Sequence, residues 1–255
     1  MEIIKGKFAE AKVFSEDLEQ YARAQLQMIC DNEVAEGSTI RVMPDVHPGK
    51  VGTIGLTMTV ENKIMLNLVG IDIGCGMTCV ELKEKRIEFQ KLDRVIAEKV
   101  PAGFSIRKNV HHLAEEFDFS RLHCYKHIQK EKAKLSLGSL GGGNHFIEVD
   151  KNVDGCLYLV VHSGSRHLGK EVTEYYINEG AKVLKNKGAD VPQPLTWLEG
   201  ELMERYIHDV EVVQEFAMLN REIIVAEITR GMKVKVSNVL SGRISFRTFR
   251  KEMVV

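Results

Sequence analysis

VGIDIGCGM, at residues 69–77, places Asp72 and Cys75 three positions apart among Gly70, Gly74 and Gly76. A tight glycine turn can direct both side chains at one point, and it lets the backbone approach a ligand closely. A cysteine thiolate there can bind one metal ion or bridge two. The alternative is a packed thiol beside an aspartate that caps the turn. The flanking glycines favour the metal site.

Two further glycine-rich stretches follow apolar runs: SLGGGNHFIEV (139–149) and VVHSGSRHLG (160–169). Consecutive glycine N–H groups can form an anion-binding concavity, and the planar guanidinium of Arg166 suits phosphate oxygens. Each stretch also carries a histidine. An ordinary turn and a structural histidine are the alternatives. Because the three loops together supply thiolate, imidazole and carboxylate, we predict that four side chains bind metal: Asp72, Cys75, His145 and His162.

A fourth polar segment, MPDVHPGK (43–50), holds Asp45 and His47 between two prolines. It can support a metal ligand through hydrogen bonds, or it can be a plain proline turn. We assign five further histidines to surface or core positions: His111, His112, His123, His127 and His208.

Hydrophobic periodicity predicts an α+β fold, a single mixed layer of short strands and helices around one core. We expect helices over Ser15–Cys30, Phe89–Val100, about Lys170–Lys185 and Glu201–Thr229. Short apolar runs beside glycines predict strands: Ile40–Met43, Ile54–Val60, Ile64–Val69, Met77–Leu82, Phe146–Val149 and Cys156–Val161.

The 255-residue chain carries a net charge of −1, so its overall charge does not favour binding to nucleic acid or to an acidic membrane. No apolar run approaches the ~20 residues of a membrane-spanning helix, and no secretory signal opens the sequence. Its five cysteines are odd in number and scattered. We expect a cytoplasmic protein.

The last segment differs from the rest in composition. Residues 230–255 contain seven Lys or Arg and one Glu, and no period of 2 or 3.6 is sustained there. We therefore divide the chain into a domain over residues 1–230 and a basic, divergent tail over residues 231–255.

Four motifs in order resemble the RtcB family of RNA ligases: MPDVHPGKVGTIGLTM, VGIDIGCGM, GSLGGGNHFIEV and HSGSRHLG. Tyr206, Asp209 and the pair Asn220-Arg221 also resemble that family. The resemblance runs from about Ile40 to Arg221.

The resemblance implies a GTP-dependent enzyme with two Mn²⁺ ions that joins an RNA 3′-phosphate or 2′,3′-cyclic phosphate to a 5′-hydroxyl, in RNA repair or tRNA splicing. It implies that Asp72, Cys75, His145 and His162 bind the ions, with Cys75 and Asn144 as catalytic residues. It also implies a guanine nucleotide beside a further set of residues: Asn144, His145, Phe146, Ile147, Glu148 and Arg166. Ligand type alone leaves zinc and iron open.

One departure concerns two downstream histidines of the family, a metal ligand in an Ile-His-Asn motif and a guanylylated histidine in a His-Gly-Ala-Gly-Arg motif. Neither motif occurs here, and His208 is the last histidine. We expect a C-terminally truncated member that retains metal and nucleotide binding without complete ligation.

Two other functions remain open. A metal-dependent phosphodiesterase or phosphatase would need only a metal-bound hydroxide. A non-catalytic, nucleotide-binding fragment would leave apolar surface of the last helix exposed, including Val210, Val213 and Phe216. The sequence does not determine the oligomeric state.

Overall fold

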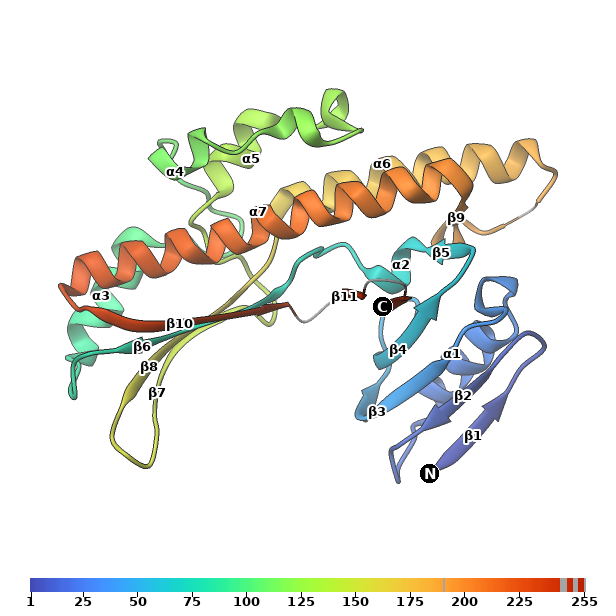
Figure 1. Cartoon of the computed structure of the whole chain (residues 1–255), viewed down its shortest axis with the longest axis horizontal. Coiled ribbons are helices and arrows are strands. Elements are labelled where there is room, and N and C mark those ends of the chain that lie inside the picture. The colour runs from blue at the N-terminus through green and yellow to red at the C-terminus, as the bar shows by residue number, and fades with distance from the viewer. Residues whose placement is uncertain (190, 244–246, 250–251, 255) are drawn as a thin grey trace. The chain divides into compact units, whose positions relative to one another are not determined.

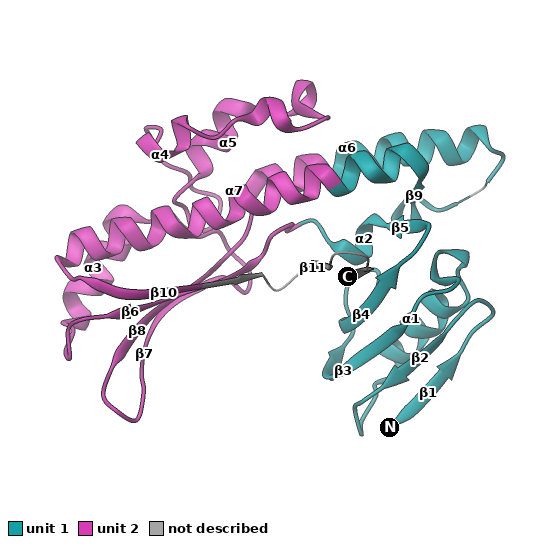
Figure 2. Cartoon of the chain, in the orientation of Figure 1, with its two compact units in different colours: residues 1–71, 173–207, 246–255 teal, residues 72–172, 208–245 magenta. Residues whose placement is uncertain are grey.

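A computed structural model describes residues 1–189, 191–243, 247–249 and 252–254. The chain forms two compact units (Figure 2): residues 1–71, 173–207 and 246–255 make unit 1, and residues 72–172 and 208–245 make unit 2. Both units mix helices and strands, which confirms the α+β class. The two long helices, α6 (Arg166–Asn186) and α7 (Gly200–Met232), contribute residues to both units.

Unit 1 is built on a six-stranded sheet in the order β1-β2-β3-β4-β12-β11, in which β2 and β3 are parallel and the other strand pairs of the described residues are antiparallel. A two-stranded sheet pairs β5 with β9. Figure 1 labels most elements of this unit. They are β1 (Glu2–Lys5), β2 (Glu10–Val13), α1 (Gln20–Cys30), η1 (Glu33–Ala35), β3 (Ile40–His47), β4 (Ile54–Val60), β5 (Lys63–Met65), α2 (Leu66–Val69), η4 (Gln193–Leu195), β9 (Trp197–Glu199), β11 (Arg247–Phe249) and β12 (Glu252–Val254).

Unit 2 is built on an antiparallel four-stranded sheet in the order β10-β6-β8-β7. Beside the parts of α6 and α7 that fall in it, its elements are β6 (Gly76–Leu82), α3 (Phe89–Lys99), α4 (His112–Glu115), η2 (Phe119–Arg121), η3 (Tyr125–His127), α5 (Lys130–Ser136), β7 (Phe146–Lys151), β8 (Leu157–Ser163) and β10 (Val236–Arg243).

The core of unit 2 follows from alternation along its strands. Val80 and Leu82 of β6 and Leu157, Leu159 and Val161 of β8 point to one face, where they are almost fully buried. α3 and α7 cover that face with apolar side chains that include Leu92, Val95, Ile224 and Ile228. Burying each such side chain contributes roughly 1.5–3 kcal/mol, so this face fixes how the helices lie on the sheet.

Most predicted elements form, but two differ. α1 begins at Gln20 rather than Ser15, because the Ser15 hydroxyl donates to the Asp17 carbonyl oxygen and caps no helix. The run Ile64–Val69, predicted as a strand, is split between β5 and the short helix α2. Short apolar runs do not distinguish strand from helix by periodicity.

The apolar side of α7 is covered. Val210, Val213 and Phe216 are each 0% exposed, so the exposed apolar surface expected of a fragment is wrong for these residues. Phe216 packs edge-on against Phe117 and Phe119, with ring centroids 5.1 and 6.0 Å away. The segment around α4 and η2 supplies this cover. Its sequence has no regular apolar period, so the packing against α7 was not predicted.

The predicted boundary at residue 230 lies within α7, and β10 then pairs with β6 from Val236 to Arg243. The division into a 1–230 domain and a 231–255 tail stays a prediction, and residues 244–246, 250–251 and 255 of that tail lie outside the described residues. Among the helices of the described residues, none has the length and apolar character needed to cross a membrane.

Candidate metal centre

Strand register brings the three glycine-rich loops to one end of the unit 2 sheet. β6 begins at Gly76, which pairs with Ser163 at the end of β8, and β7 begins at Phe146, which pairs with His162. Because these strands are antiparallel neighbours, the loop before β6, the loop before β7 and the loop after β8 must meet. The positions of Asp72, Cys75, His145 and His162 follow from this pairing.

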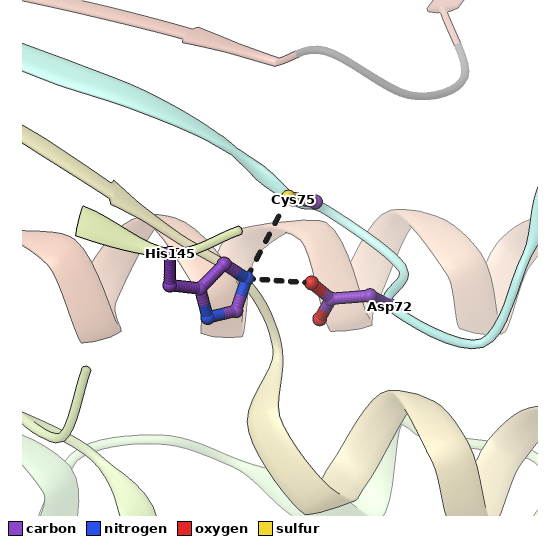
Figure 3. Close-up of side chains that lie close together, drawn as sticks. All are labelled: Asp72, Cys75 and His145. Carbon is purple, nitrogen blue, oxygen red and sulfur yellow. Dashed lines mark hydrogen bonds and ion pairs between the residues drawn. The ribbon is translucent and has the colours of Figure 1, made fainter. Parts of the chain in front are cut away.

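The four predicted metal ligands lie together there. Nε2 of His145 is 2.8 Å from Oδ2 of Asp72 and 3.8 Å from Sγ of Cys75, as the dashed lines in Figure 3 mark. Nε2 of His162 lies 3.0 Å from the same sulfur. Cys75 therefore stands between the two imidazoles, in the place that a bridging ligand would need.

The donor set fits a metal ion, and His145 provides the test. Its Nδ1 lies 2.8 Å from the carbonyl oxygen of Leu140, which can only accept, so Nδ1 carries a proton. In a neutral ring, Nε2 then carries a lone pair and points at the Asp72 carboxylate. Nε2 and the carboxylate oxygen are both acceptors, so at 2.8 Å a cation, either a proton or a metal ion, must lie between them. A backbone carbonyl that accepts from the other ring nitrogen is the usual support of a histidine ligand.

Burial and neighbouring charges shift the pKa values of three of these side chains in different directions. Burial would raise the pKa of Asp72, but hydrogen bonding to His145 and the charge of that ring hold it below its usual value. Burial, followed by the nearby Asp72 carboxylate, raises the pKa of Cys75 to about 12. Burial lowers the pKa of His162, which favours the neutral ring that binds metal.

Two glycines shape the surroundings of Asp72: Gly74 forms the turn, and Gly164 leaves space for the carboxylate. Gly74 adopts φ +75° inside a turn closed by the Cys75 N–H and the Asp72 carbonyl oxygen, 3.0 Å apart. A Cβ on Gly164 would stand 2.1 Å from Oδ1 of Asp72. A side chain at residue 164 would therefore displace the carboxylate.

Helix α7 supplies two buried residues that hold the loops together. Asn220 accepts hydrogen bonds at Oδ1 from the N–H groups of Gly138 and Ser139, and its Nδ2 donates to Ser163 Oγ and the Gly164 carbonyl oxygen. From the sequence, Asn220 and Arg221 stand out only through the resemblance to the RtcB family. Two adjacent polar residues at inward-facing helix positions were the available signal.

Arg221 completes this support. Its guanidinium is fully buried and donates to the carbonyl oxygens of Gly74 and Ser163, each at 2.9 Å, and to Thr78 Oγ1 at 3.2 Å. It thus ties the loop of Asp72 and Cys75 to the loop of His162. Buried backbone carbonyls need such partners.

Arg166, predicted to bind phosphate, begins α6 with a left-handed backbone φ of +57°. Its guanidinium packs against the glycine-rich loop beside Gly141. Nε donates to Ser139 Oγ at 3.1 Å, and Nη2 donates to the Gly103 carbonyl oxygen at 3.0 Å. Burial lowers the pKa of Arg166, and the nearby Asp72 carboxylate partly opposes that shift. Arg166 therefore lies beside the metal-ligand cluster.

The predicted nucleotide contacts divide between two sides of β7. Asn144 and Glu148 are exposed, and the Phe146 ring lies edge-on to His162 at 5.2 Å between centroids. Ile147 points the other way and packs against the apolar core. Its side chain is thus turned away from the face that carries Phe146 and Glu148.

Asp45 and His47 belong to unit 1, where MPDVHPGK begins as part of β3 rather than as a loop. The exposed His47 ring lies 2.8 Å from the carbonyl oxygen of Asp45 through Nδ1. That bond is local to the segment.

Comparison with known proteins agrees with the geometry. The sequence matches the family described as tRNA-splicing ligase RtcB over residues 25–126 and 108–247. The chain belongs to the RtcB family. This confirms the resemblance seen in the four motifs, and the match extends past residue 230.

Curated relatives within the RtcB family come from distant organisms. RNA-splicing ligase RtcB of Escherichia coli (strain K12) is 29% identical over 226 residues, covering 76% of this chain and 53% of that relative. tRNA-splicing ligase RtcB of Thermococcus kodakarensis is 27% identical, covering 72% and 49%. RNA-splicing ligase RtcB homolog 1 of Entamoeba dispar is 23% identical, covering 90% and 56%. The chain spans about half the length of the curated relatives it matches.

Proposed function

We propose that this chain carries the metal and guanine-nucleotide site of an RtcB-type RNA ligase, which joins RNA 3′-phosphate or 2′,3′-cyclic phosphate ends to 5′-hydroxyl ends. The observation that carries the proposal is the position of Cys75, whose sulfur lies between the Nε2 atoms of His145 and His162. A thiolate between two imidazoles, with the Asp72 carboxylate against the same Nε2 atom of His145, is a ligand set for two neighbouring cations.

The residues that would hold the two Mn²⁺ ions are Asp72, Cys75, His145 and His162. When bound, such ions stabilise negative charge on phosphoryl oxygens. The chain's own groups do the positioning. Asn220 and Arg221 fix the loops, and Leu140 fixes the proton on His145.

Arg166 and the exposed side of the glycine-rich loop form the proposed nucleotide and phosphate side of the site. The guanidinium is held in place by Ser139 and Gly103, so it loses little freedom when it meets a phosphate. Asn144, Phe146 and Glu148 would lie along the guanine nucleotide. For Ile147 we propose only contact through its backbone, since its side chain packs in the core.

Metal content tests the first part. Purified chain equilibrated with Mn²⁺ should retain the ion, and Cys75→Ala should lose it, because the variant lacks the shared sulfur. Cys79→Ala is the matched control, since Cys79 lies on β6 outside the cluster. Equal manganese content in wild type and Cys75→Ala would remove Cys75 from the site.

Calorimetric titration with GTP in the presence of Mn²⁺ tests the second part. Glu148→Ala should weaken GTP binding, while Asp150→Ala, on the same face of β7 but farther from the loop, should not. Equal GTP affinity in both variants would contradict the proposed contact.

RNA chemistry separates the ligase from the alternative. The family's two downstream histidine motifs do not occur in these 255 residues, so we expect no joined product from this chain alone with GTP, Mn²⁺ and matched RNA ends. Joining would show that the chain suffices. Hydrolysis of a 2′,3′-cyclic phosphate without GTP would favour a metal-dependent phosphodiesterase.

A further inference from the structure

A second group of metal-ligand side chains lies in unit 2, on α7 and the turn before η3. It consists of His123, His208 and Asp209, whose ligand atoms all lie within 4.8 Å of one another. None of these residues belongs to the cluster of Asp72, Cys75, His145 and His162. The sequence predicts surface or core positions for His123 and His208, and the structure brings the two rings together.

The group is built from a buried acid and two exposed rings. Asp209 is 0% exposed, whereas the His208 side chain is 46% exposed and His123 is also exposed. His208 and Asp209 are consecutive on α7, so their side chains leave the helix about 100° apart. Asp209 therefore points inward while His208 stays at the rim, where an ion can enter from solvent.

The carboxylate is fixed before any ion binds. Its Oδ1 accepts the N–H of His123 at 2.8 Å and its Oδ2 accepts the N–H of Cys124 at 3.1 Å. The side chain of Cys124 also hydrogen-bonds to this carboxylate. The two backbone bonds anchor His123 directly beside the acid.

The two imidazoles lie edge to face beside that acid. Their ring centroids are 4.8 Å apart at an interplanar angle of 64°, and Nδ1 of His208 lies 3.3 Å from Oδ1 of Asp209. In a tetrahedral zinc site with ligands at ~2.0 Å, ligand atoms stand about 3.3 Å apart. Both rings are exposed, so their side chains have room to turn toward a common ion.

We propose that His123, His208 and Asp209 form a second metal site that binds one late first-row divalent cation such as Zn²⁺. Two imidazoles and one carboxylate suit such an ion, and the exposed side leaves a position for water. The ion would join the turn before η3 to α7. This site is independent of the proposed ligase centre.

Zinc binding per chain is the test, measured by competition with a chromogenic chelator. The variants are His123→Ala/His208→Ala and, for the first cluster, Cys75→Ala. We expect the double variant to bind one Zn²⁺ fewer than wild type. Cys75→Ala should retain the Zn²⁺ that the double variant loses, so failure of the ligase centre and failure of this site are distinguishable.

Affinity and stability give two further readouts. Loss of outer partners of a metal site costs ~10–100-fold in affinity, so His123→Ala alone should weaken zinc binding at least that much. Added Zn²⁺ should raise the Tm of the wild type through this site, and the rise should be smaller in the double variant. His47→Ala, which removes an exposed histidine of unit 1, is the control and should behave as wild type.

Unchanged zinc stoichiometry and affinity in His123→Ala/His208→Ala would overturn the proposal. So would a Cys75→Ala chain that binds no Zn²⁺ at all. In either case Asp209 would serve only to fix the turn at His123 and Cys124.

Discussion

Arg221, buried within α7, donates a hydrogen bond from Nη1 to the carbonyl oxygen of Gly74 at 2.9 Å. Gly74 lies between the proposed ligands Asp72 and Cys75 in the turn that presents them. The same nitrogen reaches the Ser163 carbonyl oxygen, next to His162. A single helix residue thus sets the separation of two ligand loops that are far apart in the sequence.

Removing that guanidinium should destabilise the fold. Arg221→Leu leaves the buried carbonyl oxygens of Gly74 and Ser163 without this donor, and hydrogen bonds to charged groups contribute about 1.5–3 kcal/mol each. We expect urea denaturation to show a loss of about 3 kcal/mol or more. Arg205→Leu, which removes a half-exposed arginine of the same helix, should change stability by less than about 0.5 kcal/mol. Equal losses in both variants would contradict the role of Arg221.

Asn220→Asp should weaken metal binding. The new carboxylate keeps the acceptor for Gly138 and Ser139 but loses the donors to Ser163 and Gly164. Such supporting contacts are worth ~10–100-fold in metal affinity, and we expect a Mn²⁺ titration to show a change of this size. Asn62→Asp, in an exposed turn of unit 1, should leave the titration unchanged.

Gly164→Ala should abolish or severely weaken Mn²⁺ retention. The added Cβ would lie 2.1 Å from Oδ1 of Asp72, so the carboxylate must leave its place. Gly142→Ala is the control in the glycine-rich loop, since its Cβ would meet nothing closer than 3.7 Å. A Gly164→Ala chain with normal manganese content would show that Asp72 is not needed there.

Cys30 should make stability fall at alkaline pH. Burial in the unit 1 core raises the pKa of its thiol to about 11 from an ordinary value of 9.0. Between about pH 9 and 11 the unfolded thiol loses its proton while the folded thiol keeps it, so the free energy of unfolding decreases as pH rises. At ~1.4 kcal/mol per pKa unit, the total loss is about 3 kcal/mol.

Cys30→Ala isolates this effect. The variant should be less stable at neutral pH because it leaves a cavity, but its curve of stability against pH should fall less steeply above pH 9. Urea denaturation of both chains across that range measures the difference. Parallel curves would mean that Cys30 ionises equally in the folded and unfolded chain.

Several elements could be predicted from local sequence alone. α3 and β4 match their predicted bounds closely, since alternation or helical spacing of apolar residues is strong there. The helix start at Ser15 and the strand over Ile64–Val69 were predicted wrongly. Whether a serine caps a helix, and whether a short apolar run forms a strand, depends on the segments that pack and pair with it. The cover over Phe216 was missed for the same reason, as it comes from the irregular segment that contains Phe117 and Phe119.

The sequence by itself determined which side chains were chemically suited to a metal centre, because glycine turns that carry Asp, Cys and His are readable as local patterns. Only the tertiary structure decided that Cys75 stands between His145 and His162, since that depends on the register of β6, β7 and β8. It also decided the grouping of His123 with His208 and Asp209, which the spacing of these residues along the chain does not predict. Contacts between distant segments arise from packing and strand pairing, and neither is encoded at a single place in the chain.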